Sequence, residues 1–153
     1  MKFQTVEEII NYAYEKEKEA AEFYEKAKND ETFAAIKEVF ENFEVEERKH
    51  QAMLKGFSKD QKKLATYKLM PVTDLKISDY MTEITYKQGM GYPDLLRLAM
   101  KREEQAYNFY KNLGDQIEDE KLCKVFKVLA QEEAKHKNVL ETKYDDFLAS
   151  QGM

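Results

Sequence analysis

The sequence contains an internal repeat, which limits the chain to folds built from two similar halves. When the sequence is shifted by 86 residues, a segment of about 50 residues aligns with a later segment without a gap. The identities in this alignment are Ala13 and Ala99, Glu17 and Glu103, Ala20 and Ala106, Phe23 and Phe109, Tyr24 and Tyr110, Val39 and Val125, Phe40 and Phe126, Glu46 and Glu132, Glu47 and Glu133, Lys49 and Lys135, His50 and His136, and Leu54 and Leu140. Repeated segments fold alike, so the chain is expected to hold two copies of one unit.

Each copy is predicted to be a pair of helices joined by a short turn. Apolar residues recur every three or four positions in all four segments, a spacing that forms one stripe along a helix. Only 5 glycines and 2 prolines interrupt the 153 residues, so turns are few. The predicted boundaries are Thr5 with Glu8 at the start of the first helix, Asn29-Asp30 between the first and second, Pro93 in the first turn of the third, and Gly114-Asp115 between the third and fourth.

Residues 58–92 match nothing in the repeat and must connect the second helix to the third. A connection of this length can cross a whole bundle, with short helices expected at 59–67 and 77–84. Apolar residues in 64–92 are candidates for an interface. The prediction is an all-α four-helix bundle, built from two helix hairpins with a long crossover, as one domain over 1–153.

Composition excludes several classes of partner. The formal net charge is −5 and the basic residues form no stripe, so no nucleic-acid partner is expected. No apolar run is long enough to span a membrane, and the first residues are too charged for a signal peptide, so a cytoplasmic protein is expected. The single cysteine, Cys123, cannot form a Cys-x-x-Cys site and is expected to pack as a small, half-buried hydrophobe.

Charged residues interrupt the apolar stripes at equivalent places in both copies. Neighbouring glutamates, such as Glu46 and Glu132, lie at other phases of their helices. Four unpaired buried carboxylates would repel one another, and no lysine or arginine lies on these stripes to compensate them. The residues at core positions are Glu17, Glu47, His50, Glu103, Glu133 and His136.

Two divalent metal ions would cancel the charge of these four carboxylates. A glutamate and a histidine three residues apart share one face of a helix, so both can reach one centre. Oxygen-rich ligation with one imidazole per metal suits iron or manganese better than structural zinc. The sequence therefore predicts a two-metal centre, with iron or manganese favoured and zinc as a further occupant.

Tyr24 and Tyr110 lie seven residues after Glu17 and Glu103, on the same stripes. They are either core aromatic residues or hydrogen-bonding partners of the ligand carboxylates. Both interpretations remain open at this stage. In the second, the catalytic residues are Glu47, Glu133, Tyr24 and Tyr110.

The segments EKEAAEFY with EERKH, repeated as EEQAYNFY with EEAKH, resemble the rubrerythrin group of the ferritin-like superfamily. The resemblance covers nearly the whole chain and is least constrained in the crossover. It implies that Glu17 and Glu103 are terminal metal ligands and that His50 and His136 are imidazole ligands. It also implies that Glu47 and Glu133 bridge the two metal ions and that the centre reduces hydrogen peroxide to water.

The sequence departs from the rubrerythrin pattern in two places. It has no rubredoxin-like segment with two Cys-x-x-Cys pairs, so electrons are expected from a separate donor such as rubredoxin. Typical relatives have a further glutamate three residues after the third-helix ligand, where this chain has Ala106. The resemblance thus implies a more symmetric, six-ligand centre.

Three functions are compatible with these motifs. The first is a di-iron oxidoreductase that reduces hydrogen peroxide, or dioxygen, and a manganese-catalase-like reaction shares the same ligands. The second is iron oxidation and storage in the manner of ferritin. The third is a non-catalytic helical binding module stabilised by metal. The resemblance also implies a homodimer.

Overall fold

The computed structural model describes residues 3–58, 87 and 89–152 and confirms an all-helical chain. The helices are α1 (Val6–Lys28), the 3-10 helix η1 (Glu31–Ile36), α2 (Lys37–Ser58), α4 (Tyr92–Gln116) and α5 (Glu120–Ser150). No β-strand occurs in this described part of the chain. One compact unit contains α1, η1 and α2 with Gln116–Glu120, and a second contains nearly all of α4 and α5.

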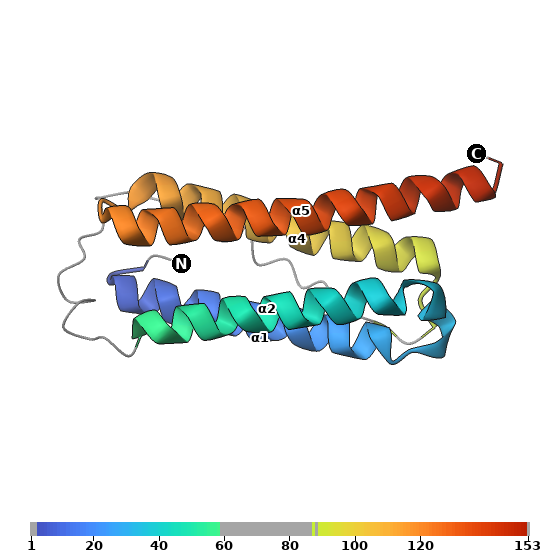
Figure 1. The fold of residues 1–153 in the computed structure, drawn as a ribbon, viewed down its shortest axis with the longest axis horizontal. Coiled ribbons are helices and arrows are strands. Elements are labelled where there is room, and N and C mark those ends of the chain that lie inside the picture. Colours follow the sequence, from blue (N-terminus) through green and yellow to red (C-terminus); the bar gives the residue numbers. More distant parts are fainter. Residues whose placement is uncertain (1–2, 59–86, 88, 153) are drawn as a thin grey trace. The chain divides into compact units, whose positions relative to one another are not determined.

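In the first unit, α1 and α2 form an antiparallel hairpin (Figure 1). Glu17 of α1 lies beside His50 of α2. About two turns further along α1, Tyr24 lies beside Phe43 of α2, with ring centroids 5.3 Å apart. As predicted, Thr5 caps α1 by accepting a hydrogen bond from the Glu8 backbone N–H at 3.1 Å. The Glu8 carboxylate accepts a hydrogen bond from the backbone N–H of Gln4 at 2.8 Å. In a capping box it would accept from the N–H of the cap residue itself, Thr5.

The connection between α1 and α2 is longer than the sequence predicted. Asn29 ends α1, but Asp30 caps η1 rather than α2, its carboxylate accepting from the Thr32 N–H at 2.9 Å. Phe33 has non-helical dihedral angles, φ −111° and ψ 30°, which mark a kink within η1. Phe33 and Ile36 are buried, so this connection packs its own apolar side chains while the chain reverses direction.

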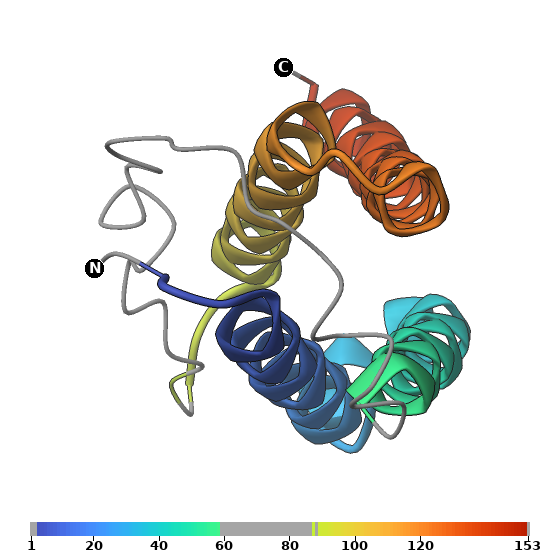
Figure 2. The ribbon, with the colours of Figure 1, turned by 90° about the vertical axis from the view of Figure 1, so that its left-hand side faces the viewer.

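In the second unit, α4 and α5 form an equivalent antiparallel hairpin, seen end-on in Figure 2. Tyr92 packs against Phe147 with ring centroids 5.4 Å apart, and at the other end Tyr110 stacks on Phe126 at 5.9 Å. Pro93 occupies the first turn of α4, as predicted.

The predicted turn at Gly114-Asp115 is wrong, because α4 continues to Gln116. Gly114 is a buried helical residue, and its carbonyl accepts a hydrogen bond from the Cys123 thiol at 2.8 Å. A Cβ at position 114 would approach Lys127 Cγ to 3.2 Å. The glycine therefore serves the close packing of α4 on α5. Cys123 is half-buried, as expected.

Two other predictions concern residues outside the described part of the chain. They are the short helices at 59–67 and 77–84 and the course of the crossover within 58–92. Among the described helices, none combines the length and the apolar content that crossing a membrane requires.

Candidate metal centre

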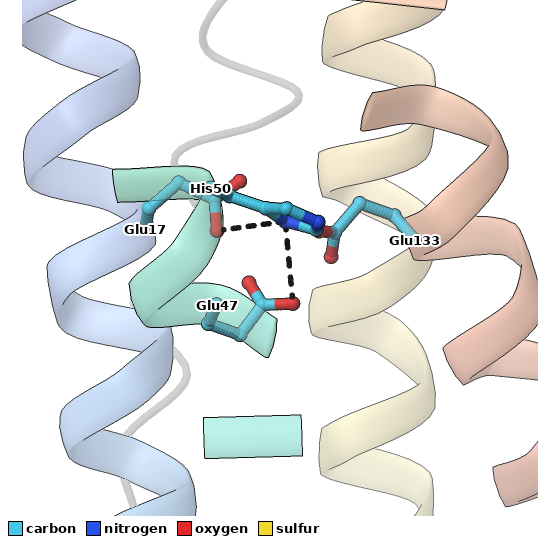
Figure 3. A group of neighbouring side chains, drawn as sticks. All are labelled: Glu17, Glu47, His50 and Glu133. Carbon is cyan, nitrogen blue, oxygen red and sulfur yellow. Dashed lines mark ion pairs between the residues drawn. The ribbon is translucent and has the colours of Figure 1, made fainter. Parts of the chain in front are cut away.

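The first hairpin brings three of the predicted ligands together, and we call Glu17, Glu47 and His50 the first half-site. Glu17 comes from α1, whereas Glu47 and His50 come from one face of α2. The imidazole Nδ1 of His50 lies 3.5 Å from Glu17 Oε2 and 3.9 Å from Glu47 Oε1 (Figure 3). One ligand atom from each residue lies within 4.8 Å of the other two, and all three side chains are buried.

The second hairpin repeats this arrangement, and we call Glu103, Glu133 and His136 the second half-site. Glu103 comes from α4, and Glu133 and His136 lie three residues apart on α5. His136 Nδ1 lies 3.4 Å from Glu103 Oε1, close to the value in the first half-site. One ligand atom from each of the three buried residues again lies within 4.8 Å of the others.

Helical phase separates these residues from the other glutamates around them. Glu47 is 1% exposed and Glu133 is 1% exposed, whereas their sequence neighbours Glu46 and Glu132 are both half-exposed. The same contrast holds on α4, where Glu103 is buried and Glu104 is exposed. Successive residues are 100° apart around a helix, so only one glutamate of each adjacent pair faces inward.

The sequence prediction missed one buried glutamate. Glu44 is 8% exposed, and it pairs with Lys28 Nζ at 2.6 Å and with Arg48 Nε at 3.0 Å. Burial alone would raise the pKa of Glu44, but the hydrogen bonds from Lys28 and Arg48 lower it below its ordinary value. The spacing of Glu44 and Arg48, four residues apart, was the available signal. The contact with Lys28 comes from another helix and leaves no local pattern.

The donors of each half-site fit a divalent cation. Each hairpin buries two half-site carboxylates and one imidazole, and no lysine or arginine is buried anywhere in the described residues. Two ionised carboxylates carry a charge of −2, which a divalent ion cancels, and a neutral imidazole completes a nitrogen–oxygen ligand set. Leaving such carboxylates ionised without a compensating charge would cost several kcal/mol each. The chemistry of these groups therefore favours one metal ion per half-site.

The two tyrosines belong to aromatic clusters. Tyr24 is 1% exposed, and its ring centroid lies 5.2 Å from that of Phe40. Tyr110 is 2% exposed and contacts Phe109 and Phe126. These ring contacts favour a packing role for both residues. Hydrogen bonding from their hydroxyls to the ligand carboxylates stays a prediction.

Comparison with known proteins identifies the fold and the family. The profile of the Rubrerythrin family matches residues 2–58 and 94–151, which hold both hairpins and all six predicted ligands. A solved structure of a hypothetical protein from Pyrococcus furiosus resembles the chain with a TM-score of 0.69 and 23% identity, over 95% of this chain and 92% of that one. No match is found among curated proteins.

At this identity the structural likeness shows the fold alone, and it agrees with the ferritin-like class predicted from the sequence. The family match and the buried carboxylate–histidine clusters together fit a metal-binding protein of the di-iron, ferritin-like kind. Because the family profile matches well over half of the residues of this chain, the chain belongs to the rubrerythrin family.

Proposed function

We propose that the two half-sites together bind two iron ions and that the protein reduces hydrogen peroxide. The observation that carries the proposal is the duplicated geometry, with histidine-to-glutamate distances of 3.5 Å and 3.4 Å in the two hairpins. A pair of ferrous ions supplies the two electrons that, with two protons, convert one hydrogen peroxide molecule to two water molecules. Membership of the rubrerythrin family supports iron over other divalent metals.

The protein's own residues would favour this reaction in two ways. The carboxylates of Glu17, Glu47, Glu103 and Glu133 carry negative charge, which attracts a trivalent ion more strongly than a divalent one. They therefore favour loss of an electron from each bound ion. Burial keeps bulk water from these carboxylates, so the same charges act more strongly than they would at the surface.

The ligands also lie on regular helices rather than on loops. Glu47 and His50 lie three positions apart on α2, and Glu133 and His136 lie three positions apart on α5, so the helix fixes the spacing within each pair. Such a framework keeps the donor atoms in place when the charge of the bound ion changes. Little rearrangement is then needed during electron transfer, which suits a centre that cycles between two oxidation states.

Completing the cycle requires an electron donor. The 153 residues include one cysteine, too few for a four-cysteine iron site. We therefore propose that a separate redox protein, such as a rubredoxin, reduces the centre. We also propose that the protein acts as a homodimer.

The proposal is tested by rapid mixing of the anaerobic diferrous protein with hydrogen peroxide, and separately with dioxygen. We expect the ferric absorbance to appear much faster with peroxide than with dioxygen, and faster than for free ferrous iron. Glu103→Gln should abolish this phase, whereas Glu104→Gln, an exposed neighbour on α4, should retain it. Oxidation no faster than that of free iron would contradict the proposal, and faster reaction with dioxygen would favour iron handling instead.

A further inference from the structure

A network of ion pairs links α1 to α2 in the first hairpin. Lys28 on α1 contacts Glu44 on α2 at 2.6 Å, and Arg48 on α2 contacts Glu25 on α1 at 2.8 Å. Arg48 also contacts Glu44 at 3.0 Å, so the two links between the helices form one network. Glu44 is buried at the centre of this network, and a partly buried ion pair is screened less than an exposed one.

This network lies close to the first half-site. Glu44 precedes Glu47 by three residues, so the two carboxylates are about one turn apart on the same side of α2. Lys28 therefore holds α1 against the turn of α2 that adjoins the ligands. On α1, Lys28 lies eleven residues after Glu17, so the network reaches the half-site through the turn of α2 that carries Glu47.

The second hairpin has no residues that could form this network. With the repeat offset of 86, Lys28 corresponds to Gly114, Glu44 to Ala130, and Arg48 to Ala134. A side chain at position 114 would approach Lys127 Cγ to 3.2 Å, so a lysine there would require a rearrangement. The two copies thus share the predicted ligands but differ in the charged residues next to them.

Polar contacts also join α4 to α5, and two of them are more exposed than the Lys28–Glu44 pair, whose side chains are 22% and 11% exposed. Lys137 lies 3.9 Å from Glu104, whose side chain is 55% exposed. Arg97 donates to the Tyr144 hydroxyl at 2.9 Å, and the Arg97 side chain is 54% exposed. Exposed polar contacts of this kind add little stability. Neither of these two contacts is an equivalent of the buried Lys28–Glu44 pair beside the first half-site.

We propose that Lys28 and Glu44 are positioning residues that preform the first half-site, so that it takes up its metal ion before the second. Without metal, the carboxylates of Glu17 and Glu47 repel each other across the two helices. The network opposes this repulsion in the first hairpin, whereas in the second the ion itself must draw the helices together. Preorganised sites bind more tightly, since less of the binding energy is spent on ordering them. This inference rests on the metal site proposed above.

The test measures Co²⁺ binding to metal-free protein by calorimetry. His136→Ala leaves the first half-site intact, and His50→Ala leaves the second. We expect the His136→Ala protein to bind its ion more tightly than the His50→Ala protein. Adding Lys28→Met should weaken binding by about tenfold in the His136→Ala protein, the lower end for loss of a supporting contact. The same change should have no effect in the His50→Ala protein.

Two further variants separate positioning from a general effect on stability. Lys28→Arg keeps the positive charge and should restore tight binding. Lys111→Met removes an exposed lysine from the second hairpin and should leave both affinities unchanged. Equal affinities of the two half-sites, or equal weakening of both by Lys28→Met, would overturn the inference. Failure of the wild-type protein to bind any Co²⁺ would instead overturn the proposed metal site.

Hydrogen exchange of the metal-free wild-type protein gives a test that needs no variant. Amides of α1 and α2 around Glu17 and His50 should exchange more slowly than those of α4 and α5 around Glu103 and His136. Addition of Co²⁺ should then slow exchange mainly in the second hairpin. Equal protection of the two hairpins before metal is added would overturn the inference.

Discussion

Adjacent glutamates on α2 have opposite environments, and this difference assigns their roles. Glu47 is buried beside His50, whereas Glu46 is half-exposed on the flank of the helix. A buried carboxylate is an energetic liability when no cation is near, but it is a strong ligand when a metal ion is bound. We therefore expect the Glu47 side chain to destabilise the metal-free protein and to stabilise the metal-bound protein.

Glu47→Gln removes this charge while keeping the volume of the side chain. Without metal, we expect the variant to be more stable than the wild type, with a free energy of unfolding about 1 kcal/mol larger. The same variant should lose metal and should be less stable than the wild type when metal is supplied. Chemical denaturation with and without metal measures both effects. Glu46→Gln is the matched control and should change neither, and a loss of stability in metal-free Glu47→Gln would contradict this assignment.

Repetition made the predicted ligands visible in the sequence, because each one recurs at the same offset. Glu44 was not predicted, since its copy is Ala130 and its partner Lys28 lies on another helix. The orientation of the Tyr24 hydroxyl also could not be predicted, because phase places a side chain on a face without fixing its hydrogen bonds. Residues that recur in both copies could thus be predicted from the sequence. A contact between two helices that occurs in only one copy, such as Lys28 with Glu44, could not.

At the scale of the helices, glycines show where packing overrides helix propensity. Gly56 in α2 has open space around it, with no atom within 4 Å of an added Cβ. Gly114 in α4 faces Lys127 of α5, where the added Cβ would lie 3.2 Å from Cγ. Alanine is favoured over glycine within a helix by about 0.5–1 kcal/mol. Replacing glycine by alanine therefore brings this gain without a steric clash at position 56, but not at position 114.

We therefore expect Gly56→Ala to raise the free energy of unfolding by about 0.5–1 kcal/mol. Gly114→Ala should gain less or lose stability, since Lys127 must move to admit the methyl group. Urea denaturation of both variants under identical metal loading measures the difference. An equal gain at both positions would show that α4 and α5 have room to separate at Gly114.

The helix boundaries illustrate why the sequence predicted elements better than their ends. The Thr5 cap was predicted because its signal is local, a hydroxyl three residues before Glu8. Gly114 was interpreted as a turn because glycine usually ends a helix. The contact with Lys127 that accounts for this glycine belongs to the packing of two helices, and it has no local signature.

At the scale of the whole molecule, the bound metal should contribute a pH-dependent share of the stability. Carboxylates bind metal when ionised and imidazoles when neutral, and their ordinary pKa values are about 4.3 and 6.5. Falling pH protonates both kinds of ligand and weakens metal binding. It also neutralises the buried carboxylates of the metal-free protein, which relieves their repulsion. Both effects bring the two forms closer in stability as the pH falls.

Two ions, each present at 100 times its Kd, add about 5.4 kcal/mol to the stability. For a chain of this length, we expect removal of both ions at pH 7 to lower Tm by about 10–20 °C. The difference should shrink as the pH falls and nearly vanish near pH 4. Scanning calorimetry with and without a chelator, from pH 7 to pH 4, measures this trend. A difference independent of pH would contradict binding of metal by these carboxylates.

Each hairpin carries a glutamate on its first helix and Glu-x-x-His on its second, so half of the predicted ligand set is encoded by a single unit of about 50 residues. Duplication of a gene for one hairpin would therefore suffice to produce all six predicted ligands. Once duplicated, either copy could diverge around its ligands while both kept them. The difference between Lys28 and Glu44 in one copy and Gly114 and Ala130 in the other is such a divergence.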